Sequence, residues 1–180
     1  MEQLCDSRKH RFLAPVVAAI FLLLGSAVAS AQGQVSFFQP PGYSCGNNAS
    51  VSADFNRDGK ADLACADGTV LLGNGDGTFR QGTSLPLSGA IIIVEADFNG
   101  DGLPDLLLVV GTTLNVFLGN GDGTFQSDKV LNTGASPNYV AVADVNGDGK
   151  VDVLALSDAS AGLFVFPGNG ERNFEAGNYL

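Results

Sequence analysis

In the sequence DFNGDGLPDLLLVV, residues 97–110, an aspartate- and glycine-rich loop leads into an unbroken apolar run. The same loop occurs twice more, as DFNRDGKADL from residue 54 and as DVNGDGKVDV from residue 144. The copies lie roughly 45 residues apart, and self-similarity at such a period is a sign of a repeat architecture. The chain is therefore built from three units of one kind.

A second motif repeats in step with the first. It reads LGNGDGTF at residues 72–79 and 118–125 and PGNGERNF at 167–174. Apolar runs without alternation follow each aspartate loop, and such runs indicate strands that are buried on both faces. Each unit is predicted to hold four short strands, at 49–53, 63–66, 69–72 and 79–85; at 91–96, 106–110, 114–118 and 125–131; and at 139–143, 153–156, 163–166 and 174–180.

Four strands per repeat with glycine-rich turns are typical of propeller blades. We predict an all-β fold of tandem four-stranded β-propeller blades within residues 32–180, with blades at about 48–85, 91–131 and 138–180. A β-sandwich is the alternative, but it does not explain the strict repetition. Three blades are fewer than the roughly four to eight that close a propeller. The ring is therefore expected to be partial or completed by oligomerisation, with self-association through exposed blade faces.

The N-terminal residues resemble an export signal. Arg8, Lys9 and Arg11 precede an apolar stretch from Phe12 to Ala29, and Ala-Ser-Ala at 29–31 fits the rule for signal cleavage. We predict a signal peptide over residues 1–31 and a secreted, periplasmic or cell-surface protein. An uncleaved anchor helix is the alternative, because the apolar stretch approaches the length that spans a bilayer.

The net charge of the chain limits the classes of partner that it can bind. The net charge of −10 disfavours nucleic acid, whose binding needs basic patches, and it favours metal cations. No membrane span is expected once the signal is removed.

Cys45 and Cys65 are the only cysteines after residue 31. In an exported protein they can form a disulfide, but two buried free thiols are the alternative.

The aspartate loops have the oxygen pattern of a calcium site. Oxygen-bearing residues at positions 1, 3 and 5, glycine at 6 and a carboxylate at 9 make a shortened relative of the EF-hand loop. The position 7 backbone carbonyl is a further candidate ligand, and Gly59, Gly102 and Gly149 are expected in the left-handed region. The candidate ligands for about three Ca²⁺ ions are Asp54, Asn56, Asp58, Lys60 and Asp62; Asp97, Asn99, Asp101, Leu103 and Asp105; and Asp144, Asn146, Asp148, Lys150 and Asp152, where Lys60, Leu103 and Lys150 offer the backbone carbonyl.

The alternative is that the loops are turns that bind no metal, because Asp, Asn and Gly are also good turn residues. Three copies that keep every ligand position favour the metal, since carboxylates crowded without a cation repel one another. Magnesium demands a tighter octahedron, and zinc prefers His and Cys. Asp76 and Asp122, in the NGDGTF motifs, are interpreted as hairpin turn residues and not as metal ligands.

The paired motifs DFNGDGLPDL and LGNGDGTF resemble FG-GAP/VCBS-type repeats, which are similar to the calcium-bearing blades of the integrin alpha-subunit propeller. The resemblance covers about residues 35–180. It implies one calcium ion between the first two strands of each blade, held by the loop residues given above. It also implies an exported binding or adhesion module whose ligand, a protein or a glycan, the sequence does not identify.

Two other functions are alternatives to a binding or adhesion module. A carbohydrate-binding lectin is expected to show aromatic platforms, but Trp is absent and the tyrosines are Tyr43, Tyr139 and Tyr179. The chain also resembles the non-catalytic part of some larger secreted enzymes. Residues 32–180 contain no His, and no nucleophile arrangement stands out. The chain is therefore not expected to be an enzyme.

Overall fold

The computed structural model describes residues 42–45, 49–158, 162–171, 174–175 and 178–179. The predicted signal peptide, residues 1–31, lies outside them, so its cleavage stays a prediction. No helix in the described ranges is long and apolar enough to cross a membrane. The regular structure of these ranges consists of β-strands.

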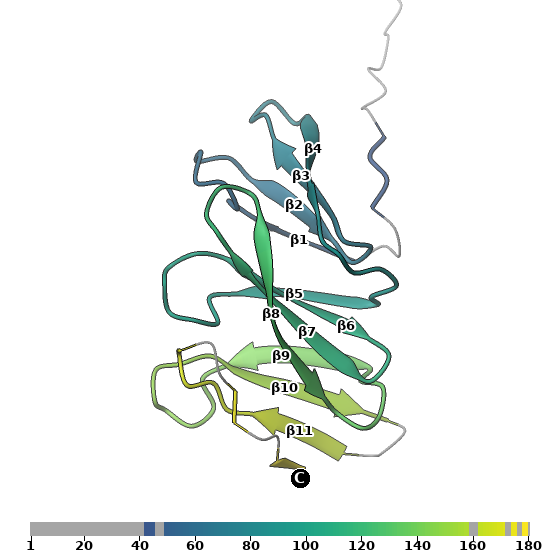
Figure 1. The fold of residues 1–180 in the computed structure, drawn as a ribbon, viewed down its shortest axis with the longest axis vertical. Helices are drawn as coiled ribbons and strands as arrows, with labels where there is room; N and C mark the ends of the chain where they lie inside the picture. Colours follow the sequence, from purple (N-terminus) through teal and green to yellow (C-terminus); the bar gives the residue numbers. More distant parts are fainter. Residues whose placement is uncertain (1–41, 46–48, 159–161, 172–173, 176–177, 180) are drawn as a thin grey trace, which may run out of the picture. The chain divides into compact units, whose positions relative to one another are not determined.

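The strands form three antiparallel sheets of four, and in each sheet the strands are neighbours in sequence order (Figure 1). We call the sheets blades 1, 2 and 3. Blade 1 holds β1 (Ser50–Ala53), β2 (Asp62–Cys65), β3 (Thr69–Gly73) and β4 (Phe79–Ser84); blade 2 holds β5 (Ile92–Ala96), β6 (Asp105–Val110), β7 (Thr113–Gly119) and β8 (Phe125–Asn132); blade 3 holds β9 (Tyr139–Ala143), β10 (Asp152–Ser157), β11 (Gly162–Phe166) and β12 (Asn178–Tyr179).

Two apolar cores lie between consecutive blades. The first joins Ala64, Ala66 and Val70 of blade 1 to Leu106 and Leu108 of blade 2. The second joins the other face of blade 2 to blade 3. It includes Leu107, Val109, Leu114, Val153 and Ala155. Alternate residues of a strand point to opposite faces, so β6 contributes to both cores. This explains its unbroken apolar run, and the predicted fold of tandem four-stranded blades is confirmed.

The outer strand of blade 3 departs from the prediction. A strand was expected over 174–180, but the described residues show a bridge between Gly168 and Phe174 and the two-residue strand β12. In blades 1 and 2 the Asn74 and Asn120 N–H groups donate to the carbonyl oxygens of Thr78 and Thr124. The third copy has asparagine in place of this threonine, and its turn motif has diverged from the other two.

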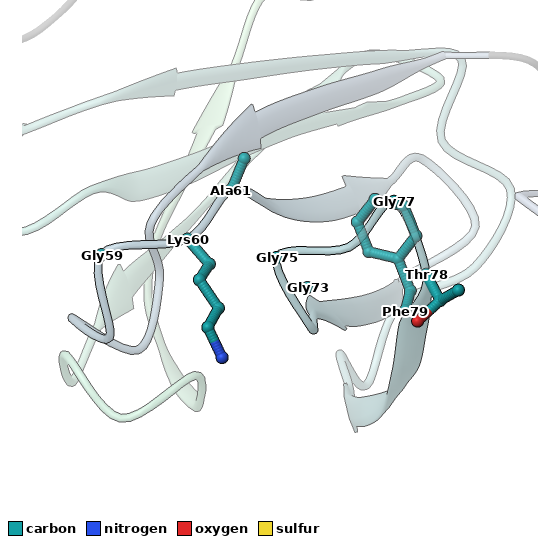
Figure 2. A pocket seen from close by; sticks show the side chains of 8 residues that line it. All are labelled: Gly59, Lys60, Ala61, Gly73, Gly75, Gly77, Thr78 and Phe79. Atoms are coloured by element: carbon teal, nitrogen blue, oxygen red, sulfur yellow. The ribbon is translucent and has the colours of Figure 1, made fainter.

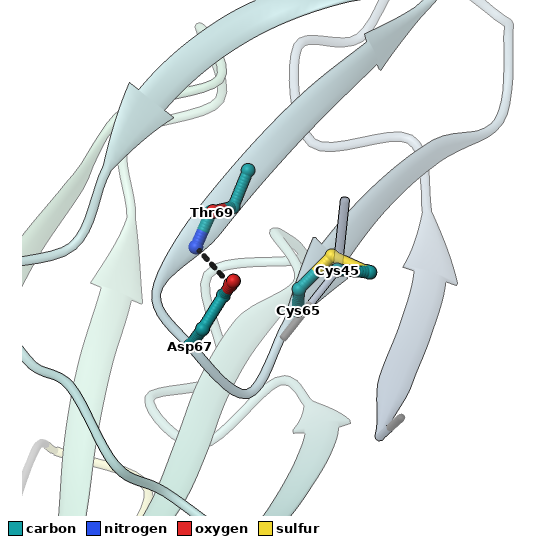
Figure 3. Close-up of a disulfide and its surroundings, with 4 residues drawn as sticks. All are labelled: Cys45, Cys65, Asp67 and Thr69. Carbon is teal, nitrogen blue, oxygen red and sulfur yellow. Dashed lines mark hydrogen bonds between the residues drawn. A yellow bond between two sulfur atoms is a disulfide. The ribbon is translucent and has the colours of Figure 1, made fainter. Parts of the chain in front are cut away.

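A short segment, residues 42–45, contacts blade 1 through a disulfide and a tyrosine. Cys45 and Cys65 form a disulfide with 5.3 Å between their Cα atoms (Figure 3), which settles the alternative left open by the sequence. Tyr43 packs edge-on against Phe79, with 5.3 Å between ring centroids, and its hydroxyl oxygen accepts the Phe79 N–H at 2.8 Å. We call Tyr43 and Cys45 the cap of blade 1.

Candidate metal centres in the aspartate loops

The first aspartate of each loop binds the backbone of its own loop. In blade 2, Asp97 Oδ1 accepts the Gly100 N–H at 2.7 Å, and Asp97 Oδ2 accepts the Gly102 N–H at 2.8 Å. Asp144 accepts the equivalent two N–H groups in blade 3, those of Gly147 and Gly149. Short Asx side chains favour such local bonds. These contacts fix the carboxylate against the loop.

The side chains at loop positions 3 and 5 also form hydrogen bonds within their own loop. Asn99 Oδ1 accepts the Asp101 N–H at 2.9 Å, and Asp101 Oδ1 accepts the Leu103 N–H at 2.8 Å. The Asn99 side-chain amide also donates to Asp101 Oδ2 at 2.9 Å. The same bonds recur in the other two loops. The loops are therefore preorganised by their own amide groups.

The ninth aspartate is the buried member of each set. Asp62, Asp105 and Asp152 have no exposed surface. Asp105 Oδ2 accepts the Phe98 N–H at 2.9 Å, and its Oδ1 accepts the Gly119 N–H at 2.8 Å. Each of these carboxylates thus joins its aspartate loop to the glycine-rich turn of the same blade. The loop pattern alone does not predict this structural role, but the paired recurrence of the two motifs indicates it.

Burial raises the pKa of Asp105 from 3.8 to about 6, opposed by the N–H groups of Gly119 and Phe98 and assisted by the neighbouring charges of Asp101 and Asp97. A raised pKa means that the native state binds the proton more tightly than the unfolded state. In the metal-free protein, the contribution of Asp105 to the free energy of unfolding is therefore lost as the pH rises from about 4 to about 6. A cation close to Asp105 would favour the ionised form.

The donor chemistry of the loops fits a hard cation. Each loop offers carboxylate oxygens, one amide oxygen and backbone carbonyls, which are the ligands that Ca²⁺ takes. A carboxylate oxygen has more than one lone pair, so an accepted N–H does not prevent coordination. Within the described ranges, no three His, Cys, Asp or Glu side chains lie close enough together to form a metal-holding group. The ligand assignment therefore stays a prediction.

Position 4 distinguishes the first loop from the others. The glycines at position 6 have φ angles of 79°, 80° and 82°, as the sequence predicted for Gly59, Gly102 and Gly149. Gly100 and Gly147, at position 4, are also left-handed, with φ of 76° and 80°. The first loop places Arg57 there, at φ 60°. Non-glycine residues in this region carry backbone strain.

Replacing Arg57 by glycine is expected to stabilise the calcium-free protein by about 0.5–1 kcal/mol, because it removes that strain. Chemical denaturation in the presence of a chelator measures the change in the free energy of unfolding. Gly147→Ala is the matched control at the same loop position, and it should destabilise by a similar amount. A loss of stability in the Arg57→Gly variant would contradict the assignment of strain.

The NGDGTF motifs are structural turns, as predicted. Asp76 Oδ1 accepts both the N–H and the hydroxyl of Thr78, at 2.9 and 2.6 Å. Asp122 binds Thr124 in the same way. These hydrogen bonds lower the pKa of both aspartates, and the bond from the threonine hydroxyl has the larger effect. Both carboxylates are therefore engaged in holding the turn.

Aspartate loops also contact the turn of the next blade. The Phe55 carbonyl accepts the Gly123 N–H at 2.9 Å, and the Phe55 ring lies 5.4 Å from that of Phe125. Phe98 and Phe174 repeat the ring contact at 5.9 Å. The loops thus link neighbouring blades as well as strands.

On blade 1, a pocket of about 450 Å³ lies between the Lys60 loop and the turn that ends at Phe79 (Figure 2).

The fold and the paired motifs define a protein built from β-propeller-type repeats. Residues 97–155 match the model of the FG-GAP-like repeat, which confirms the resemblance found in the sequence. Comparison with curated proteins gives no significant match.

Among solved structures, the chain is similar to a lectin from Agrocybe aegerita whose structure is described as the basis of specific recognition of non-reducing terminal N-acetylglucosamine. The TM-score is 0.55 and the sequence identity 28%, over 72% of this chain and 37% of the lectin. The chain therefore spans well under half the length of that lectin. Together the two likenesses support a fold of β-propeller-type repeats.

Proposed function

We propose that this chain is an exported, non-catalytic binding module in which one calcium ion rigidifies each blade. The observation that carries the proposal is the same preorganised loop in all three blades, with oxygen ligands at positions 1, 3, 5 and 9. In blade 2 these are Asp97, Asn99, Asp101 and Asp105. A bound cation would offset the repulsion among these carboxylates. It would also fix the loop that touches the next blade, and so present a rigid surface to a ligand.

Calcium is expected to raise the thermal unfolding midpoint by on the order of 10 °C over the value in chelator, since an ion that binds only the folded state stabilises it. Differential scanning calorimetry with calcium, magnesium or chelator measures the shift. Magnesium should give a smaller one, because it accepts fewer ligand geometries. The triple variant Asp54→Ala, Asp97→Ala and Asp144→Ala is the control and should show none. An unchanged wild-type midpoint would count against the calcium sites.

The loop at Asp97 is expected to bind calcium most tightly and the loop at Asp54 least tightly. The first loop carries Arg57 and Lys60, the third carries Lys150, and the second carries no basic residue. Pro104 further restricts the second loop. Isothermal titration of the single variants Asp54→Ala, Asp97→Ala and Asp144→Ala tests the order, because Asp97→Ala should remove the tightest component. Equal affinities at the three loops would contradict it.

The Cys45–Cys65 disulfide supports the exported part of the proposal, since disulfides persist in oxidising compartments. The basic and apolar residues at 8–29, followed by the small-residue site at 29–31, supply the matching signal. Mass spectrometry of the protein secreted by an export-competent host tests this, because cleavage after Ala31 gives a chain that begins at Gln32. An intact N-terminus on a membrane-retained protein would favour the anchor instead.

Glycan binding is the second candidate, and the likeness to the lectin favours it. A glycan array probed in calcium and in chelator distinguishes the two candidates. Binding to glycans that end in N-acetylglucosamine, but not to those that end in galactose, would assign the lectin function. Absence of any glycan signal from folded, calcium-loaded protein would favour a protein ligand.

A further inference from the structure

A small polar pocket lies where the aspartate loop of blade 2 meets blade 3, and we call it the junction pocket. Its volume is about 210 Å³, which is room for roughly seven water molecules at about 30 Å³ each. That is the scale of one sugar ring or one side chain. Blade 2 lines it with Asp97, Phe98 and Gly100, and blade 3 with Lys150, Val151 and Gly170.

The side chain at loop position 7 forms one wall of the junction pocket and of the related hollow on blade 1. On blade 1, Lys60 extends beside Gly75 (Figure 2), and a Cβ placed on Gly75 would lie 3.2 Å from Lys60 Cδ. On blade 3, a Cβ placed on Gly170 would lie 3.2 Å from Lys150 Cδ. The stem of each lysine therefore lies along the turn of its own blade.

The residue at loop position 4 decides whether the junction with the next blade is open. Between blades 1 and 2, a Cβ placed on Gly121 would lie 3.0 Å from Arg57 Cδ and 3.1 Å from Leu103 Cδ2. The stem of Arg57 therefore occupies the space beside the turn of blade 2. Between blades 2 and 3, position 4 is Gly100, which has no side chain. The junction pocket lies in the place that the arginine would take.

The two charged side chains of the junction pocket have opposite signs. Asp97 offers acceptor oxygens and Lys150 offers N–H donors. Among the residues that the structure describes, Lys150 forms no ion pair, whereas Lys60 Nζ lies 4.0 Å from Asp58 Oδ2. Asp97 would repel an anionic ligand, and Lys150 would repel a cationic one. The pocket therefore suits a neutral ligand whose polar groups both donate and accept hydrogen bonds.

The hydroxyl groups of a sugar meet this requirement, because each one both donates and accepts. Neighbouring hydroxyls on one ring can donate to Asp97 and accept from Lys150 together, which offsets the cost of taking both charges out of water. Phe98 and Val151 supply apolar surface for the C–H groups of the ring. An amide side chain of a protein is also neutral, but it offers one such group, whereas a sugar ring offers several around its edge.

We propose that the junction pocket binds one neutral sugar residue at the end of a glycan, with its hydroxyl groups between Asp97 and Lys150. The proposal rests on the glycan-binding candidate given above, and it assigns that function to one junction of the array. Arg57 closes the corresponding place between blades 1 and 2. Loop position 4 therefore determines which of these two junctions takes a sugar.

Titration of the calcium-loaded full chain with free N-acetylglucosamine, galactose, glucose or mannose, followed by amide NMR signals, tests the proposal. Gly100→Arg reproduces the arginine that loop 1 already holds at φ 60°, and it should lower the affinity by about tenfold or more. Lys150→Met keeps the stem but loses the ammonium donor, and a similar loss is expected. Gly147→Arg is the matched control at φ 80°: nothing lies within 4 Å of its Cβ, so the affinity should not change.

A gain of binding is expected from the opposite exchange. Arg57→Gly together with Leu103→Lys gives the junction of blades 1 and 2 the open space and the ammonium of the junction pocket. The amide signal of Gly121 should then shift with added sugar, as that of Gly170 does in the wild type. The wild-type chain should show the shift at Gly170 and not at Gly121.

A sugar that binds the wild type and the Gly100→Arg variant equally would overturn the junction pocket and leave the glycan-binding candidate standing. Failure of all four sugars to bind a wild type that calcium stabilises would overturn both, and leave the calcium-rigidified module. An equal loss of affinity in Gly147→Arg and Gly100→Arg would show that loop strain, and not a filled pocket, lowers the affinity. That result would also overturn the proposal.

Discussion

Replacing Asp105 by alanine is expected to destabilise the calcium-free protein by about 2–4 kcal/mol, because it strands two buried N–H groups. Asp105 is fully buried and accepts the N–H of Phe98 at 2.9 Å and that of Gly119 at 2.8 Å. Alanine offers neither bond, and removing a fully buried side chain leaves a cavity at the start of β6. Release of a costly buried charge offsets part of the loss.

Asp101→Ala is the matched control, since it removes an exposed carboxylate from the same loop. Its bonds to the Leu103 N–H and to the Asn99 amide are solvent-accessible, so the expected loss is about 1 kcal/mol or less. Both variants are measured by urea denaturation in chelator, which separates folding from calcium binding. Equal losses in the two variants would show that the buried carboxylate does not hold the loop to the turn.

The repeat explains how much of the fold could be predicted from the sequence. Periodicity located four strands in each blade, because a strand buried on both faces needs a continuous apolar run such as 106–110. The left-handed glycines at position 6 follow from the EF-hand-like pattern of each loop, which needs a sharp turn at that position. The second strand starts at the ninth aspartate and not after it, since Asp105 already pairs with Ala96 in the sheet.

Other features could not be predicted, because they depend on contacts between distant residues. The cap is one example, since nothing local to Tyr43 indicates that it binds Phe79, and the cysteines gave no register for their bridge. The pair of hydrogen bonds that each ninth aspartate accepts is another example. Sequence spacing marked Asp105 as a ligand, but the Gly119 N–H that it accepts comes from the far end of β7. Divergence in the third turn motif likewise explains why the strand predicted over 174–180 is reduced, in the described residues, to a bridge at Phe174 and the short β12.

Gly119→Ala is expected to destabilise the protein by about 3 kcal/mol or more, because the new methyl group has no room. An ideal Cβ on Gly119 would lie 2.4 Å from the carbonyl oxygen of Pro104, which is backbone and cannot swing aside. The equivalent contacts of Gly73 and Gly168, with Ala61 and Val151, are 2.1 Å. The first glycine of each turn motif is therefore set by the close approach of two chain segments.

The clash acts on the candidate metal centre as well as on the fold. Moving Pro104 away from β7 displaces Asp105, which follows it, and weakens the 2.8 Å bond from the Gly119 N–H. We therefore expect the Gly119→Ala variant to lose calcium affinity at the Asp97 loop while the loops at Asp54 and Asp144 keep theirs. Gly102→Ala is the control: its Cβ meets open space, so only the strain of φ 80° remains, about 1 kcal/mol. Similar losses of stability in both variants would mean that conformation, and not the contact with Pro104, fixes glycine at 119.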